Sequence, residues 1–118
     1  MQIGVTFPQR EIKADPGAIR EFVQAVEGLG YNHMVIADHV LGADPQFHPE
    51  LTGRPYTHES IVHEIFALMA YVASCTQSLG LLTGVLILPQ RQAALVAKQA
   101  AQIDFLSGGR LRLGIGTG

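Results

Sequence analysis

Short apolar runs alternate along this chain with longer segments in which apolar residues recur every three or four positions. Four β-strands are expected at the apolar runs 3–7, 34–37 and 79–88 and at a segment that starts at Arg110. Helices are expected between them, at 16–29, about 58–74 and about 92–106. Strands that alternate with helices are typical of βαβ units on a parallel sheet. The pattern therefore predicts an α/β fold with the order β-α-β-α-β-α-β.

The first helix has the clearest boundaries. Asp15 can cap its amino end, Pro16 suits its first turn, and Gly30 follows its last apolar position. Pro89 ends the third apolar run, and the Ser-Gly-Gly sequence at 107–109 ends the third helix. The stretch 40–57 has no such period and contains several Gly and Pro residues, so it predicts an extended loop. Long loops inside compact domains usually serve function.

This element order is compatible with two architectures, an open doubly wound sheet and the first half of a (β/α)8 barrel. In both, ligands bind at the carboxyl ends of the strands. Asp38 and His39 follow the second strand, and Thr117 and Gly118 follow the fourth. Because the sequence stops on the glycine turn that should deliver a binding loop, we expect it to be the front part of a larger enzyme.

Composition narrows the classes of function. The 118 residues include 8 Lys and Arg against 10 Asp and Glu, so neither a polybasic face for nucleic acid nor an acidic tail is expected. A small-molecule ligand fits this balance better. Cys75 is the single cysteine, which excludes an internal disulfide and a Cys-rich zinc site. The sequence shows no basic leader, and its apolar run at 78–88 is far shorter than the roughly 20 residues of a membrane span. We therefore expect a cytoplasmic protein that does not enter the membrane.

Asp38 and His39 are the first candidates for chemistry. Neighbouring side chains on a strand point to opposite faces, so one of them can face a pocket while the other fixes the backbone. A histidine exchanges protons near neutral pH, and a nearby aspartate can tune it. An Asp that caps the loop, with the His packed beneath it, explains the pair equally well. Glu59 and His63 lie four residues apart, but one such pair is not a metal site, and we predict no metal.

Two glycine features leave similar alternatives. Gly84 interrupts the apolar third strand, where glycine marks a bulge, a close ligand or simply room for a neighbouring helix. The Gly-Ile-Gly-Thr-Gly segment at 114–118 is a weak dinucleotide signal, since it follows the fourth strand and no helix comes after it. A tight turn explains it as well.

Taken together, an ordered set of motifs resembles the luciferase-like monooxygenase superfamily, and more closely its branch that uses coenzyme F420. The set consists of 37–39 (Ala-Asp-His), 82–91 (Leu-Thr-Gly-Val-Leu-Ile-Leu-Pro-Gln-Arg), 97–98 (Ala-Lys), 106–110 (Leu-Ser-Gly-Gly-Arg) and 113–118 (Leu-Gly-Ile-Gly-Thr-Gly). The resemblance implies that residues 1–118 are the N-terminal part of a single TIM-barrel domain, cut at the end of the fourth strand.

The resemblance also implies a site. A non-prolyl cis peptide at Gly84–Val85 would support the central ring of the cofactor. Asp38 and His39 would lie beside the reactive edge of that ring, as the catalytic residues. Asp38, Thr117 and Gly118 would also help to bind the cofactor, and Phe7 would help to wall a substrate pocket.

The expected activity follows from the cofactor. A deazaflavin is restricted essentially to hydride transfer, and His39 is the candidate for the accompanying proton. We therefore expect an oxidoreductase that transfers a hydride between coenzyme F420 and an organic substrate. FMN on the same fold would instead support a monooxygenase. A third hypothesis is an inactive half-barrel that only self-associates, because its outer strands have bare edges; a homo-oligomer is expected in any case.

Overall fold

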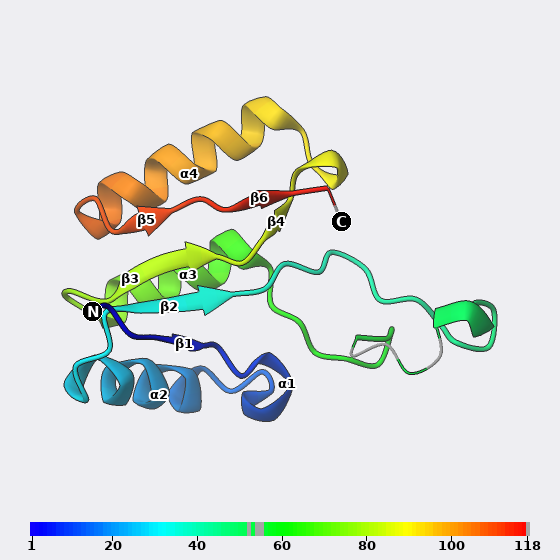
Figure 1. Ribbon diagram of the computed structural model, residues 1–118, viewed down its shortest axis with the longest axis horizontal. Coiled ribbons are helices and arrows are strands. Elements are labelled where there is room, and N and C mark those ends of the chain that lie inside the picture. The colour runs from blue at the N-terminus through cyan, green and yellow to red at the C-terminus, as the bar shows by residue number, and fades with distance from the viewer. Residues whose placement is uncertain (52, 54–55, 118) are drawn as a thin grey trace.

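The computed structural model describes residues 1–51, 53 and 56–117, and its centre is a parallel β-sheet (Figure 1). The sheet contains β1 (Gly4–Thr6), β2 (His33–Ile36), β3 (Gly80–Thr83) and β5 (Leu111–Arg112), hydrogen-bonded in that order. A second parallel pair joins β4 (Leu86–Ile87) to β6 (Ile115–Gly116). This confirms the predicted α/β fold with parallel strands.

The strand order distinguishes the two architectures that the element order left open. In a doubly wound sheet the order reverses near the first strand. Here each strand lies beside the preceding one in sequence, as in the wall of a barrel. The fourth expected strand is β5 together with β6, and the third is β3 together with β4.

Only one face of the sheet is covered by the helices of this chain. Met34, Ile36 and Leu81 point to the covered face and are fully buried. On the other face, Thr6 is exposed and Leu82 is half-buried. Helices cover both faces of a doubly wound sheet, so the one-sided burial also favours the barrel.

Helix α2 (Pro16–Gly28) forms where the sequence predicts it, beside β1 (Figure 1). The Asp15 carboxylate accepts hydrogen bonds from the Gly17 and Ala18 amides at 2.8 and 3.1 Å, which satisfies donors that the first turn leaves unpaired. An apolar stripe on α2 is buried against the sheet and consists of Ile19, Val23 and Val26.

Glu27, near the end of α2, anchors the segment that leads into β3. Its carboxylate accepts hydrogen bonds from the backbone amides of Gln77, Ser78 and Leu79 at 2.6 to 3.0 Å. Burial alone would raise the pKa of Glu27, but these backbone donors and the Ser78 hydroxyl outweigh burial and lower it. The ionised form of Glu27 is therefore the form that holds the chain at the entry to β3.

Helix α3 (Ile65–Cys75) begins seven residues later than the predicted start at 58. The hydrophobic period continued through Ile61, but that side chain is 43% exposed and lies outside the helix. The reason is that side chains take up backbone amides that a longer helix would use. The Gln9 side chain accepts from the His63 amide at 2.9 Å, and the Glu64 carboxylate caps the helix by accepting from the Ala67 amide at 2.7 Å. Extended backbone at Glu64 therefore ends the loop.

The remaining elements are short, apart from one long helix. A four-residue helix, α1 (Gln9–Ile12), follows β1, and 3-10 turns occur at η1 (Pro49–Leu51) and η2 (Leu88–Gln90); none of them was expected. Helix α4 (Ala93–Ser107) ends at Gly108 and Gly109, whose φ angles of 70° and 83° favour glycine.

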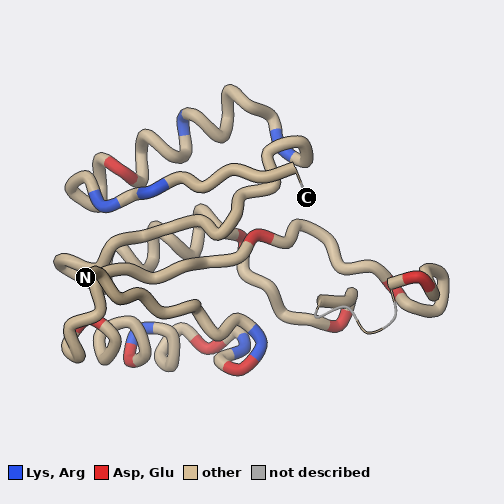
Figure 2. The backbone as a smooth tube through the Cα atoms, in the orientation of Figure 1, with Lys and Arg blue, Asp and Glu red and all other residues tan. Residues whose placement is uncertain are grey.

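Charged residues lie mainly on the helices and loops, and the strands β1 to β4 have none (Figure 2). Among the described residues, no helix is long and apolar enough to cross a membrane.

Candidate functional site at the carboxyl ends of the strands

A β-bulge separates β3 from β4 at the carboxyl end of the third strand. The pairing positions Leu82 and Leu86 are four residues apart, whereas their partners Arg112 and Ile115 are three residues apart, so the third strand contains one extra residue. The Gly84–Val85 peptide bond at this point is cis. Gly84 and Val85 are both exposed, and Val85 retains 45% of its accessible surface. The bulge therefore presents backbone and one apolar side chain on the surface.

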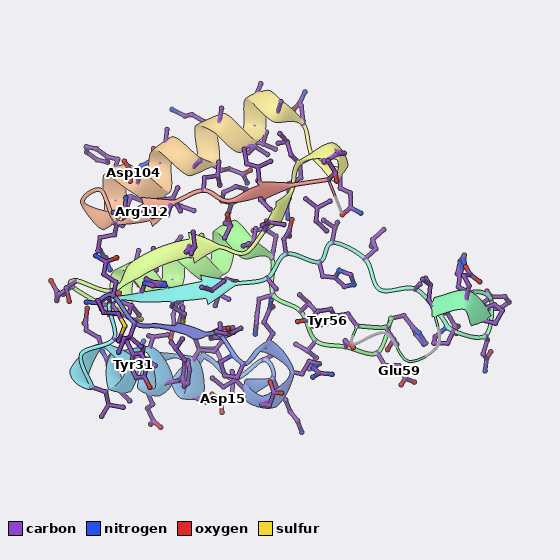
Figure 3. All side chains as sticks on the ribbon, in the orientation of Figure 1. Asp15, Tyr31, Tyr56, Glu59, Asp104 and Arg112 are labelled. Atoms are coloured by element: carbon purple, nitrogen blue, oxygen red, sulfur yellow. The ribbon has the colours of Figure 1, made fainter. Side chains whose placement is uncertain are left out.

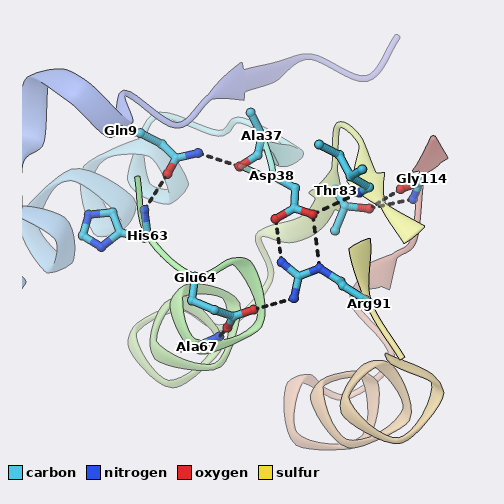
Figure 4. A network of polar contacts seen from close by, with 10 residues as sticks. Gln9, Ala37, Asp38, His63, Glu64, Ala67, Thr83, Arg91 and Gly114 are labelled. Atoms are coloured by element: carbon cyan, nitrogen blue, oxygen red, sulfur yellow. Dashed lines mark hydrogen bonds and ion pairs between the residues drawn. The ribbon is translucent and has the colours of Figure 1, made fainter. Parts of the chain in front are cut away.

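Thr83 replaces the backbone pairing that the bulge interrupts. Its hydroxyl donates to the Gly114 carbonyl at 2.7 Å and accepts from the Gly114 amide at 2.8 Å (Figure 4). A Cβ atom at Gly114 would collide with the Thr83 carbonyl oxygen, and one at Gly116 would collide with the Val85 side chain. Glycine at these two positions lets the fourth strand pass close beside the bulge.

Asp38 and His39 lie on opposite faces of the sheet. Burial alternates without a break from His33 to His39, and it continues past the end of β2 at Ile36. Asp38 falls on the covered face, where it is 7% exposed, and His39 falls on the open face, where it is half-buried. Asp38 thus lies in the framework and His39 lies on the open face, and the chemical roles expected of the two residues stay predictions.

The Asp38 carboxylate is fully engaged within the protein (Figure 4). One oxygen accepts from Arg91 Nη2 at 2.7 Å, and the other accepts from Arg91 Nε at 3.2 Å and from the Ile87 amide at 3.0 Å. Its side chain is 1% exposed. The Asp38 carboxylate is therefore part of the framework of this chain, and its expected roles in binding a cofactor and in catalysis stay predictions.

Arg91 joins Asp38 to the start of α3. Its Nη1 donates to Glu64 Oε1 at 3.0 Å, and its guanidinium carbon lies 5.6 Å from the centre of the Phe66 ring. The hydrogen bonds to Asp38 raise the pKa of Arg91 above its ordinary value, although partial burial opposes the charge. Local sequence gave no signal for this ion pair, since the two residues are 53 positions apart.

His39 contacts the long loop that follows it. Its ring centre lies 4.8 Å from that of Tyr56, and the Arg10 guanidinium lies 5.8 Å from the same tyrosine ring. Figure 3 labels Tyr56 on this loop, which extends from the carboxyl side of the sheet. A shallow pocket beside His39 is lined by residues 40–42 and by residues further along the loop, including Thr57 and Val62. His39 is therefore a titratable group at the edge of an open pocket.

Gln9 is a buried polar residue that the sequence analysis missed. Its side chain donates to the Ala37 carbonyl at 2.6 Å and accepts from the His63 amide, which links the end of β2 to the segment before α3 (Figure 4). It is 3% exposed. No periodicity or spacing distinguishes such a glutamine from a surface residue, so sequence alone could not have identified it.

The other expected site residues have different surroundings. Phe7 is 3% exposed and packs edge-on against Phe22 and His63, each at 6.0 Å between ring centres. Phe7 is a core residue of this chain, and its expected place on the wall of a substrate pocket stays a prediction. Thr117 is exposed at the end of the fourth strand, and Gly118 lies outside the described residues.

These surroundings limit the chemistry that the carboxyl edge can support. The exposed bulge is an apolar, backbone-rich surface, and His39 and Thr117 provide polar groups at the ends of the two neighbouring strands. Within 1–51, 53 and 56–117, no three His, Cys, Asp or Glu residues gather as metal ligands would.

A family model, curated relatives and solved structures match this chain. The family model for luciferase-like monooxygenases matches residues 1–118. An uncharacterized protein of Mycobacterium tuberculosis is 36% identical over 98 residues, which cover 80% of this chain and 34% of that protein. The chain thus spans about a third of the length of the curated relatives that it matches.

Solved structures with the same fold include enzymes with different cofactors. The coenzyme F420-dependent tetrahydromethanopterin reductase of Methanopyrus kandleri matches with a TM-score of 0.72 and 20% identity, over 99% of this chain and 27% of that one. The oxygenating constituent of 3,6-diketocamphane monooxygenase from Pseudomonas putida, in complex with FMN, matches with a TM-score of 0.72 and 19% identity, over 100% of this chain and 30% of that one. At these identities they show the fold alone. With the parallel barrel wall and the family match over its whole length, the chain belongs to the luciferase-like monooxygenase family.

Proposed function

We propose that this chain forms the ring-binding edge of an oxidoreductase that transfers a hydride between coenzyme F420 and a small organic substrate. The observation that carries the proposal is the exposed bulge at Gly84 and Val85, with His39 and Thr117 at the ends of the strands on either side. The family membership and a reductase that uses coenzyme F420 among the structural neighbours support it.

Each group would have a distinct task. The bulge would support the centre of the ring, and Thr117 and Gly118 would lie near its polar rim. Bound coenzyme F420 supplies the hydride acceptor or donor. Removing a hydride from a C–H bond leaves one proton to be taken from the substrate, and the reverse reaction needs one proton to be supplied. His39 would hold that proton, because a histidine exchanges protons near neutral pH and His39 follows β2 on the open face, in a pocket that His58 also lines.

Asp38 would act indirectly in this scheme. Its carboxylate is buried and paired with Arg91, so it would fix the backbone that carries His39 and would not exchange a proton with the substrate. Residues 1–118 would be the N-terminal part of one barrel domain, since the open face of the sheet is the face that further strands of a barrel would enclose.

The second candidate function is an FMN-dependent monooxygenase. The FMN-bound structural neighbour favours it, because its fold matches as well as that of the reductase. The third candidate is a half-barrel that only self-associates, and the uncovered face and the edges of β1 and β5 favour it. The first candidate predicts binding of coenzyme F420, the second predicts binding of FMN, and the third predicts binding of neither.

A binding titration separates them. The protein encoded by the longest reading frame that contains these residues is purified. It is titrated with coenzyme F420 and, separately, with FMN, and binding is followed by absorbance and fluorescence. Saturable binding of coenzyme F420 supports the hydride transferase, whereas selective binding of FMN supports the monooxygenase. Binding of neither ring, with a monodisperse even-numbered oligomer in light scattering, overturns both enzyme proposals.

His39→Asn then tests the proton role in the protein that binds the ring. A positioned acid or base contributes about 10²- to 10⁴-fold to the rate, so turnover should fall by at least about 10²-fold with ring affinity little changed. His48→Asn is the matched control, because His48 is an exposed loop histidine whose Nδ1 lies 3.2 Å from Glu50. Equal turnover in the two variants would exclude His39 as the proton carrier.

A further inference from the structure

The segment after the bulge lacks a backbone partner on the side of β2. Strand β2 pairs with β3 up to Ile36 and Thr83, and β4 pairs with β6. Within the described residues no ladder joins β2 to β4. The Ile87 amide instead donates to the Asp38 side chain at 3.0 Å. This carboxylate thus takes the place of the missing strand on that side of β4.

Arg91 fixes that carboxylate from the other direction. It approaches with two donors, at 2.7 and 3.2 Å, and its third donor reaches Glu64, which caps α3. Arg91 also lies only four residues after Ile87 in the chain. The short segment 87–91 is therefore tied to Asp38 at both of its ends, by the Ile87 amide and by the Arg91 guanidinium.

The bulge itself makes few bonds of its own. The Gly84 amide donates to the Ile36 carbonyl and the Leu86 amide donates to the Gly114 carbonyl, both at 2.8 Å. Val85 is exposed between them. The position of this surface relative to His39 therefore depends on these two bonds and on how the chain is held just after them, at Ile87.

We propose that Arg91 is a positioning residue for the ring-binding surface: by holding the Asp38 carboxylate it sets the position of β4, and with it the position of Gly84 and Val85. This inference rests on the proposed function, because it concerns the affinity of the same surface for the same ring.

Loss of Arg91 would leave the Asp38 carboxylate buried without its cation. A buried carboxylate that loses its cation takes up a proton or moves toward solvent. Protonation weakens the acceptor of the Ile87 amide and movement removes it, so either change loosens the bulge. Because a small displacement of a binding surface lowers its affinity by a large factor, the affinity for the ring should fall about tenfold or more.

The test compares Arg91→Met with Arg110→Met, because Arg110 is a second arginine that donates several hydrogen bonds within the protein. Arg110 donates to Ser107, Ala73, Leu79 and Thr76, at 2.7 to 3.2 Å, just before β5 and therefore at the amino ends of the strands. Arg110→Met should destabilise the fold but leave the affinity of the folded protein for the ring within about twofold. The probes are coenzyme F420 and FMN, titrated well below the unfolding temperature of each variant.

Hydrogen exchange of the Ile87 amide provides a readout that needs no cofactor. Exchange at Ile87 should accelerate in Arg91→Met and stay near the wild-type rate in Arg110→Met. At saturation with the ring, the absorption and fluorescence spectra of Arg91→Met should also differ from those of the wild type. If Arg91→Met does not fold, Arg91→Lys replaces it. Lysine keeps the charge but lacks the planar group that binds Asp38 through two donors at once, so an intermediate affinity is expected.

The outcomes separate this inference from the proposed function. If the wild type binds neither ring, the proposed function fails, and the Ile87 exchange rates alone decide whether Arg91 holds β4. If the wild type binds a ring and the Arg91 variant binds it equally well, the inference is overturned and the proposed function stands. Equal Ile87 exchange in the Arg91 and Arg110 variants also overturns it.

Discussion

Replacing Thr83 by valine tests how the sheet is held together where the bulge interrupts it. Valine has nearly the same shape as threonine but no hydroxyl, so the change removes the two hydrogen bonds to Gly114, at 2.7 and 2.8 Å, without emptying space. The Gly114 carbonyl keeps the Leu86 amide as a donor, whereas the Gly114 amide loses its acceptor.

The expected cost follows from these bonds. Each hydrogen bond contributes a net stabilisation of about 1 kcal/mol, and a buried donor left without a partner costs more. Thr83 is 1% exposed, while Gly114 is half-buried, so water compensates only part of the loss. The free energy of unfolding should therefore fall by about 2 to 3 kcal/mol.

Urea unfolding followed by circular dichroism measures this change, with Thr6→Val as the matched control because Thr6 is exposed on β1. An exposed substitution of this kind stays within about 0.5 kcal/mol. The midpoint for Thr83→Val should drop by roughly 1 M or more with an unchanged slope. The Gly114 amide should also exchange its hydrogen faster. If Thr83→Val is as stable as Thr6→Val, or if the Gly114 amide keeps its protection, the hydroxyl does not replace the strand pairing.

Two further substitutions probe other contacts of the framework. Glu27→Gln should lower the free energy of unfolding at pH 7 by about 1 to 3 kcal/mol, because the charged acceptor of several backbone amides is lost, and exposed Glu21→Gln should have little effect. The pKa of Glu27 is lowered from 4.5 in the folded state, so its stabilisation is present above the unfolded value and disappears as the pH falls through the folded value. Unfolding measured between pH 7 and pH 3 should therefore show the gap between wild type and Glu27→Gln closing in acid; a constant gap would contradict this linkage. Gly114→Ala should cost about 1 to 3 kcal/mol in thermal unfolding, because its Cβ would collide with the Thr83 carbonyl. Gly28→Ala, which has open space around it, should be neutral or slightly stabilising, and equal effects at the two glycines would rule out the close approach of the strands.

Hydrophobic periodicity was sufficient to predict the order of the strands and of the three long helices, since each signal lies within a short window, but it did not predict the short helix α1. It failed where side chains from distant parts of the chain compete for backbone groups. The apolar spacing continued to Ile61, yet Gln9 takes the His63 amide and delays the start of α3. Periodicity also could not show that the third strand is divided into β3 and β4, because a glycine such as Gly84 can also lie within an unbroken strand.

The candidate site was predictable by position and much less so by role. That Asp38 and His39 follow a strand is evident from the sequence, and the alternation of a strand places them on opposite faces. Which residue faces the pocket depends on Arg91, more than 50 positions away, whose pairing with Asp38 is a tertiary contact. Phe7 illustrates the same limit, because its burial against Phe22 and His63 depends on packing that no local pattern reveals.

The unbroken alternation of burial from His33 to His39 means that the number of residues in this segment decides which side chain is buried and which is presented on the open face. An insertion or deletion of one residue in the segment before Asp38 would exchange the faces of Asp38 and His39. The carboxylate would then lie on the open face and the imidazole would be buried. Point substitutions at His39, by contrast, leave the length of this segment unchanged. The side chain presented at this position can accordingly be changed by single substitutions, provided that the length of the strand before it is kept.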